Sequence, residues 1–140
     1  MAVICQYCGN TSRLSTGAEK YPEHPHLARK KLWICDPCAA WVGCIDDTDI
    51  PLGELADEKL RSARRLAHDT YNPIIALMQQ VYPKETEQSV RAKVYIWIAK
   101  KMKLSPDEMR FGGLTYNQCL RAIKLGENGS TEGSKVALVY

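Results

Sequence analysis

Two C-x-x-C pairs near the start of the chain constrain its fold more than any other feature. The pairs Cys5-Gln6-Tyr7-Cys8 and Cys35-Asp36-Pro37-Cys38 are separated by 26 residues. Two residues between cysteines let the chain turn so tightly that both sulfurs of a pair reach one ion. Four such thiolates form a closed tetrahedron that suits zinc and leaves no open position for substrate or water. The sequence therefore predicts one structural zinc ion, and its ligands are Cys5, Cys8, Cys35 and Cys38.

Other uses of these cysteines stay open at this point. The pairs also fit disulfides or redox pairs, and four thiolates also bind iron. Cys44, or one of His24 and His26 in the proline-bounded loop between the pairs, is an alternative to one of the four ligands. Cys119 lies on the apolar face of a predicted helix, where a buried and inert thiol is the usual outcome.

The remaining composition excludes several classes of protein. No run approaches the ~18 apolar residues that a spanning helix requires, so a membrane protein is not expected. The start of the sequence, MAVICQYCGN, has no basic segment followed by a long apolar stretch, as a secretory signal would. We expect a cytoplasmic protein, because a reducing compartment leaves the thiols free to bind metal. No motif for a small-molecule substrate is evident.

Residues 1–46 are predicted to form a zinc-ribbon-like β module. Short segments of β-branched and aromatic residues lie directly beside the cysteine pairs, at 3–4, 31–34 and 41–42. Frequent turn residues argue against long helices in this part of the chain. A module of this size cannot stabilise itself by apolar burial alone, so metal binding should be coupled to its folding.

Residues 47–126 have the apolar spacing of helices. We predict four of them, over about 55–71, 73–81, 88–103 and from Thr115 to about Gly126. Ser105 with Glu108, and Thr115 with Gln118, have the residues and spacing of capping boxes at helix starts. The fold class is therefore α+β, with the β module packed with a C-terminal bundle of about four short helices in one composite domain. Residues 127–140 are predicted to be a flexible tail, in which 136–140 are either a free end or an added edge strand.

Charge is unevenly distributed along the chain. Counting Lys and Arg against Asp and Glu, residues 1–44 have five against three, 45–83 have four against seven, and 84–140 have ten against six. Proteins that bind duplex DNA usually have a larger positive excess, because phosphate neutralisation dominates their affinity. A nucleic-acid partner is thus compatible with the composition but not required by it.

One basic stripe is a candidate partner-binding surface. Arg61, Arg64, Arg65 and His68 are spaced i, i+3, i+4 and i+7, so a helix gathers them on one face. Such a stripe suits phosphate. The alternative is that neighbouring acidic residues pair with these arginines on a solvated face.

With these residues laid out, the chain resembles a family of small zinc-finger-containing proteins of uncharacterised function, which occur in bacteriophages, prophages and other mobile elements. The match covers about residues 4–125. It rests on Cys5-x-x-Cys8-Gly9, Tyr21-Pro22, Trp33-x-Cys35-Asp36-Pro37-Cys38-x-Ala40-x-Val42-Gly43-Cys44, Pro51-Leu52-Gly53-x-Leu55-Ala56, Leu60-Arg61-x-x-Arg64-x-x-Ala67-His68, Tyr95-x-Trp97-Ile98-Ala99 and Cys119. The resemblance implies the zinc site and a mobile-element setting, and it implies no activity.

The chain also departs from that family's pattern. Family members usually have His after the Gly-Cys pair, where this chain has Ile45. They also tend to have Phe-Asp and a Trp near Tyr71, Asn72 and Ile75. A histidine after a cysteine-rich hairpin, with a second on the next helix, would resemble a metal-dependent HNH nuclease. Without the first histidine, His68 has no obvious catalytic partner.

These observations favour a non-enzymatic, zinc-stabilised binding protein whose partner is nucleic acid or a host protein. The alternative is an HNH-type nuclease with a structural zinc ion, which would need a general base and a second, open metal site. The acidic turn at Asp46, Asp47 and Asp49 is a candidate for such a site, although acidic turns more often only cap and solvate the chain.

Overall fold

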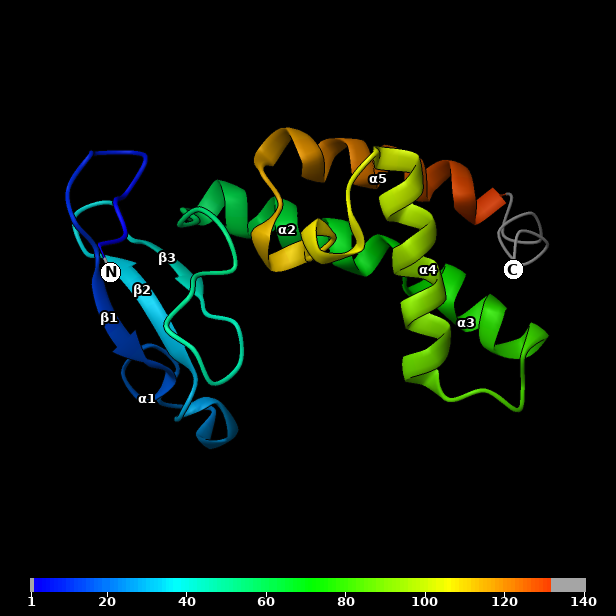
Figure 1. Ribbon diagram of the computed structural model, residues 1–140, viewed down its shortest axis with the longest axis horizontal. Helices are drawn as coiled ribbons and strands as arrows, with labels where there is room; N and C mark the ends of the chain where they lie inside the picture. Colours follow the sequence, from blue (N-terminus) through cyan, green and yellow to red (C-terminus); the bar gives the residue numbers. More distant parts are fainter. Residues whose placement is uncertain (1, 132–140) are drawn as a thin grey trace. The chain divides into compact units, whose positions relative to one another are not determined.

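The computed structural model describes residues 2–131, and the side chains of residues 2–127 (Figure 1). The described chain has two compact units, and the division between them falls between Ser62 and Ala63. The first unit contains a three-stranded sheet and the cysteine pairs, and the second consists of helices. The predicted α+β class is therefore confirmed.

The sheet is a small antiparallel meander in the order β1-β2-β3. Its strands are β1 (Arg13–Thr16), β2 (Lys31–Cys35) and β3 (Ala40–Gly43). β2 and β3 were expected, because their residues are β-branched, aromatic or apolar. β1 was not expected, because its side chains are mostly exposed and give no apolar alternation.

Two further short elements belong to the first unit. The helix α1 (Gly17–Lys20) follows β1 directly, and a 3-10 turn, η1 (Pro25–Leu27), precedes β2. The segment at residues 3–4 forms an isolated bridge between Ile4 and Thr11 in place of a full strand.

Residues 47–57, assigned from the sequence to the helical region, instead complete the first unit. This segment runs antiparallel to β3, with isolated bridges between Cys44 and Pro51 and between Trp41 and Ala56. The backbone N–H of Ala56 donates to the carbonyl of Trp41 at 2.9 Å, and the Trp41 N–H donates to the Ala56 carbonyl at 3.0 Å. Leu55 is 1% exposed as a result. The helix predicted to start near residue 55 therefore starts later.

Four longer helices follow, as the apolar spacing predicted. They are α2 (Glu58–Thr70), α3 (Asn72–Val81), α4 (Glu87–Met102) and α5 (Tyr116–Thr131). Two 3-10 turns, η2 (Pro106–Glu108) and η3 (Phe111–Gly113), lie between α4 and α5. Among the described residues, no helix is both long enough and apolar enough to cross a bilayer.

Polar caps fix the starts of several helices. The Thr86 hydroxyl accepts a hydrogen bond from the Ser89 backbone at the start of α4. Ser105 and Glu108 form the predicted capping box around η2. A second predicted box precedes α5, where Thr115 and Gln118 each accept a hydrogen bond from the other's backbone N–H, at 3.2 and 2.9 Å. Each cap satisfies backbone N–H groups that lack a partner within the helix.

The second unit has its own apolar core, where α3, α4 and α5 pack against one another. Tyr71 is fully buried between α2 and α3, and its hydroxyl donates to the Ala122 carbonyl in α5 at 2.7 Å. Burial raises the pKa of Tyr71 well above its usual range, which keeps the hydroxyl a donor. The other core side chains include Ile74, Met78, Val90, Val94, Ile98, Leu114 and Cys119.

Gly126 has a different role from the one the sequence suggested. It was expected to end the last helix, but α5 continues to Thr131. A Cβ atom at position 126 would lie 2.5 Å from Cγ2 of Thr70 and 3.1 Å from the Tyr71 ring. Gly126 therefore allows close packing of α5 on the end of α2. The tail predicted at 127–140 is helical as far as residue 131, and residues 132–140 lie outside the described chain.

We expect Gly126→Ala to lower the free energy of unfolding by roughly 1–2 kcal/mol. Overpacking costs about 1–3 kcal/mol, and it exceeds the gain of about 1 kcal/mol in helix propensity. Urea denaturation would measure the change. Thr70→Ser removes the opposing methyl group but keeps the hydroxyl that donates to the Leu66 carbonyl, so it should recover part of the loss. A more stable Gly126→Ala protein would contradict the packing role.

Candidate metal centre

The first cysteine pair lies in a tight hairpin loop at the start of the chain. The Gly9 backbone N–H donates to the Cys5 carbonyl at 2.8 Å, and the Cys5 N–H donates to the Asn10 carbonyl at 2.9 Å. Gly9 has a φ of +76°, a left-handed conformation that glycine adopts without steric cost. This turn brings Cys5 and Cys8 to the same side of the loop.

The second pair forms the connection between β2 and β3. Cys35 is the last residue of β2 and is paired with Ala40, the first residue of β3. The loop between them closes with a hydrogen bond of 3.1 Å from the Ala39 N–H to the Asp36 carbonyl. Ala39 itself has a φ of +49°. The strands therefore fix the position of this loop, which makes the second pair part of the sheet.

The four sulfurs form one cluster. All four Sγ atoms lie within 4.8 Å of one another, and those of Cys8 and Cys35 are 3.6 Å apart. Four sulfurs bound to one zinc ion at about 2.3 Å each are about 3.8 Å from one another, so this spacing matches a tetrahedral site. It is too long for a disulfide, in which the sulfurs are about 2.05 Å apart. The prediction that the two pairs meet is confirmed.

The surroundings shift the pKa values of the clustered thiols in different directions. A hydrogen bond from the Asn10 backbone N–H, together with the neighbouring thiols, lowers the pKa of Cys8 to about 7. The Cys8 sulfur and burial raise the pKa of Cys38 to about 12. The backbone N–H of Cys38 favours a Cys35 thiolate, but burial and the adjacent sulfurs outweigh it and raise the Cys35 pKa. Closely spaced thiolates repel one another, and a bound cation removes that penalty.

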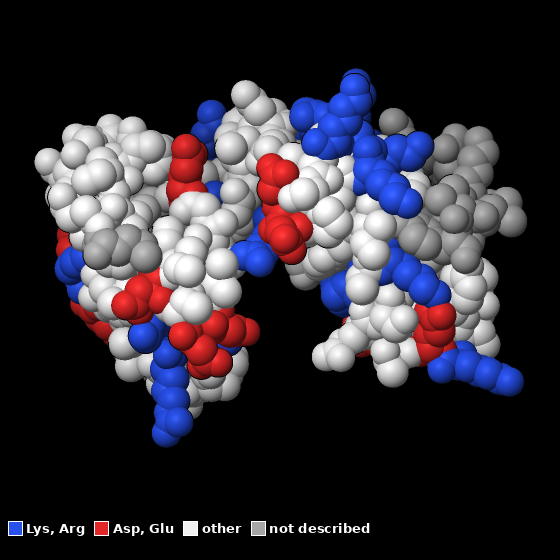
Figure 2. Space-filling view, viewed as in Figure 1, with Lys and Arg blue, Asp and Glu red and all other residues white. Residues whose placement is uncertain are grey.

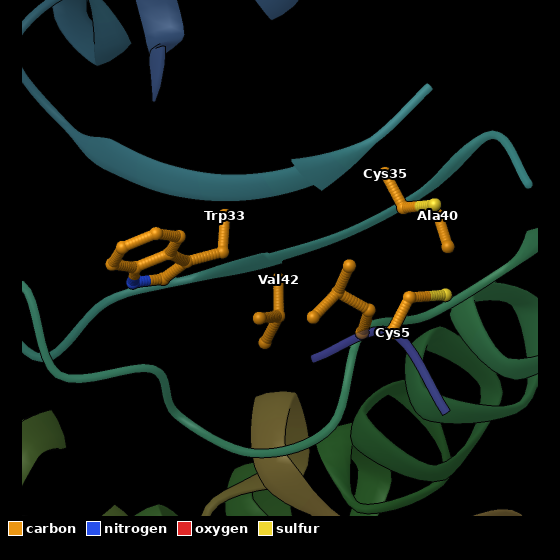
Figure 3. Close-up of a cluster of buried hydrophobic side chains, with 6 residues drawn as sticks. Cys5, Trp33, Cys35, Ala40 and Val42 are labelled. Carbon is orange, nitrogen blue, oxygen red and sulfur yellow. The ribbon is translucent and has the colours of Figure 1, made fainter. Parts of the chain in front are cut away.

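An apolar cluster supports the centre from one side. Figure 3 shows the side chains of Cys5, Cys35 and Ala40 at one end of a row that continues through Val42 to Trp33. Leu55 completes this buried cluster. Cys5 is fully buried and Cys35 is 3% exposed, whereas Cys8 is exposed and Cys38 partly so. Two ligands therefore belong to the core, and two lie near the surface.

The donor set fits zinc. Four cysteine sulfurs within 4.8 Å of one another can form a closed site, and zinc in such a site acts as a structural cross-link with no position for a reacting group. When bound, zinc would tie the first hairpin, at Cys5 and Cys8, to the β2–β3 loop, at Cys35 and Cys38. Its role there would be to stabilise the fold of the first unit.

The alternative ligands do not join the cluster. Cys44, His24 and His26 are all outside the four-sulfur group. Instead, Cys44 lies beside a depression of about 460 Å³ that also has His26 and Arg29 in its wall. Cys119 is fully buried in the second unit, as predicted, and burial raises its pKa.

Two carboxylates of the acidic turn form ion pairs with lysines. Lys30 Nζ lies 2.8 Å from a carboxylate oxygen of Asp46, and Lys31 Nζ lies 2.8 Å from one of Asp49. The indole N–H of Trp33 also donates to the Asp49 carbonyl at 2.7 Å. Within the described residues, this turn does not form a second group of metal-binding side chains. It anchors the loop after β3 to the sheet.

The predicted basic stripe is not one exposed surface. Arg64 is 7% exposed, and its Nε donates to the Leu114 carbonyl at 2.8 Å, so it is part of the helical core. Arg61 donates to the carbonyls of Ala39 and Ala56 at 3.0 and 2.6 Å. Arg65 and His68 are exposed. The helical spacing was correct, but it did not distinguish side chains that face solvent from those that face backbone carbonyls.

Sequence reasoning missed a cluster around Trp41 that holds the centre in place. The Arg61 guanidinium carbon lies 3.5 Å from the Trp41 ring centroid, and Lys20 Nζ lies 4.0 Å from it. The indole N–H donates to the Tyr21 hydroxyl at 2.8 Å. In addition, Gln6 Nε2 donates to the Leu55 carbonyl at 2.6 Å. Both residues had been noted for other reasons, Trp41 in a predicted strand segment and Arg61 in the predicted basic stripe.

We expect metal removal to unfold the first unit. A chelator such as EDTA should release one zinc ion per chain and expose Trp33 and Trp41, because the unit is too small to stay folded on burial alone. Tryptophan fluorescence of a Trp97→Phe protein would report on this unit, since its remaining tryptophans are in the sheet. Cys38→Ser should weaken zinc binding severely, whereas the matched Cys44→Ser should retain it. Equal zinc loss in both variants would contradict the ligand assignment.

Zinc affinity should fall as the pH is lowered. The bound form needs thiolates, so each protonated thiol must release its proton when zinc binds. Cys38 has a pKa of about 12, so it is protonated from pH 6 to pH 8 and releases its proton on zinc binding throughout this range. Cys8 has a pKa of about 7, so it has a proton to release on zinc binding mainly below pH 7. Proton release should therefore be larger at pH 6 than at pH 8 by about one proton. Calorimetry in buffers of different ionisation enthalpy would measure it. A pH-independent affinity would exclude thiolate ligands.

Comparison with known proteins supports this assignment. The family model of a zinc-finger-containing domain, DUF3268, matches residues 1–128. The match spans both units and includes all four cysteines of the cluster. Among curated proteins and among solved structures, the searches found no match. The chain therefore belongs to the DUF3268 family of zinc-finger-containing domains.

Proposed function

We propose that this chain is a non-enzymatic binding protein, in which zinc gives the first unit its shape and the folded chain binds another macromolecule. The observation that carries this proposal is the closed four-sulfur cluster. A zinc ion with four protein ligands has no position at which to activate water or polarise a substrate. The partner is nucleic acid or a protein of the host cell. The acidic and basic residues around the centre pair with each other, which is typical of a folded surface and not of a catalytic site.

The proposed setting is that of a phage or mobile-element protein that acts in the host cytoplasm. The support is the resemblance described above. Proteins of such elements often act on host machinery or on nucleic acid, and both uses need a binding surface. Zinc-stapled modules serve both kinds of partner, so the fold alone does not choose between them.

An HNH-type nuclease is the alternative function. Catalysis would require a second, open metal site beside a general base. His68, the candidate base, has its Nδ1 atom 3.1 Å from an Asp69 carboxylate oxygen, and its ring packs edge-on against Phe111. The part of the chain that the structure describes contains no second cluster of metal-binding side chains for it to act with. These contacts argue against the nuclease.

We expect no magnesium-dependent or manganese-dependent cleavage of plasmid DNA or of RNA by the zinc-loaded protein. Gel assays would compare the protein with a His68→Ala variant from the same purification, so that any trace of contaminating nuclease appears in both. Cleavage that requires the divalent ion and disappears in the variant would overturn the proposal in favour of the nuclease.

A further inference from the structure

The helical unit has an exposed surface that is rich in basic side chains. Figure 2 shows Lys and Arg gathered over the C-terminal end of α4 and the neighbouring part of α5. These two segments share an interface in the second unit. We name four of their exposed basic residues the α4–α5 basic face: Lys101, Lys103, Arg121 and Lys124.

Among the described residues, the side chains of this face differ from most other basic side chains in their ion pairing. In the described residues, ion pairs engage basic side chains such as Arg13, Lys30, Lys31 and Arg91. Lys101, Lys103, Arg121 and Lys124 take part in none of these ion pairs. From residue 95 to residue 126 the sequence has six Lys and Arg but only Asp107 and Glu108 as acids. The Glu108 carboxylate accepts the Ser105 backbone N–H.

Helix electrostatics explain only part of this face. Lys100 and Lys101 are in the last turn of α4, where the helix dipole favours cations. Arg121 and Lys124 are in the interior of α5, where that effect has faded. They are one turn apart, on the side of α5 opposite the buried Cys119 and Ala122. The dipole therefore gives no reason for the two positive charges on α5.

We propose that the α4–α5 basic face binds the phosphodiester backbone of nucleic acid. This inference rests on the proposed binding function and names its partner. Unpaired cations on adjacent helices neutralise phosphates and release condensed counterions, which gives affinity without base recognition. The stripe on α2 is less suited to this role, because Arg61 and Arg64 donate to backbone carbonyls within the protein. Flexible, exposed lysines conform to an extended polyanion more readily than to a shaped protein pocket.

The test is a fluorescence titration of the zinc-loaded protein with labelled duplex DNA, single-stranded DNA and single-stranded RNA at 50 and 200 mM salt. If all four cations of the face contact phosphates, affinity should fall roughly 50-fold to 150-fold between these salt concentrations, from a slope of about −0.7 to −0.9 per phosphate. The three probes identify the form of nucleic acid that is preferred. Weak binding with no salt dependence to all three would overturn the inference.

A pair of variants with equal net charge locates the surface. The face variant combines Lys101→Gln, Lys103→Asn, Arg121→Gln and Lys124→Gln, with Asn at 103 because that residue has a φ of +59°. The control combines Arg29→Gln, Lys30→Gln, Lys59→Gln and Lys84→Gln, which are also exposed. The face variant should lose at least ten-fold in affinity and reduce the salt slope by about 3–4, with little change in the control. Equal losses in both would show that only net charge matters and would overturn the assignment.

Zinc content and unfolding midpoint of both variants should equal those of the parent. These two measurements distinguish a loss of binding from a loss of structure.

The outcomes also separate this inference from the proposed function. Zinc-dependent binding of a defined protein, with no nucleic-acid affinity, would contradict the inference and leave the binding function intact. Metal-dependent cleavage would contradict the binding function itself.

Discussion

The close approach of four cysteine sulfurs is the constraint on which the first unit depends. Cys5 and Cys8 are held by a hairpin of their own, while Cys35 and Cys38 flank the turn between two strands of the sheet. Thiols with sulfurs as little as 3.6 Å apart cannot all ionise without repulsion unless a cation lies between them. When bound, zinc would supply that charge and a link between two hairpins that are far apart in the sequence. The apolar row behind the sulfurs then extends this link into the sheet.

The sequence predicted the features that depend on local chemistry. The C-x-x-C spacing identified all four members of the cluster, and the caps at Ser105 and Thr115 were correct to the residue. Features that depend on tertiary contacts were harder to predict. β1 is an exposed strand with no periodic signal, and the first helix was predicted to start near residue 55, although Ala56 instead forms a bridge with Trp41 of β3. Gly126 was expected to end the last helix, but it instead allows α5 to pack closely against Thr70 at the end of α2.

The contacts of the basic residues were also hard to predict from the sequence. Helical spacing placed Arg61, Arg64 and Arg65 on one stripe, but spacing does not reveal which carbonyls a guanidinium meets. A buried Arg64 stabilises the connection before α5, and Arg61 joins the start of α2 to the Trp41 ring. Lysines are common near helix C-termini, so those at the end of α4 gain interest only because α5 adds Arg121 and Lys124 to the same unit. Structural arginines and surface lysines therefore have different roles here.

X-ray absorption at the zinc edge tests the central claim most directly, because it measures the coordination shell in solution. For protein purified aerobically without added metal, the account predicts one zinc ion per chain with four sulfur neighbours at about 2.3 Å and no nitrogen or oxygen. A shell that contains lighter atoms would bring a histidine or water into the site and would reopen it to catalysis. Metal-free, folded protein with paired cysteines would contradict the account altogether.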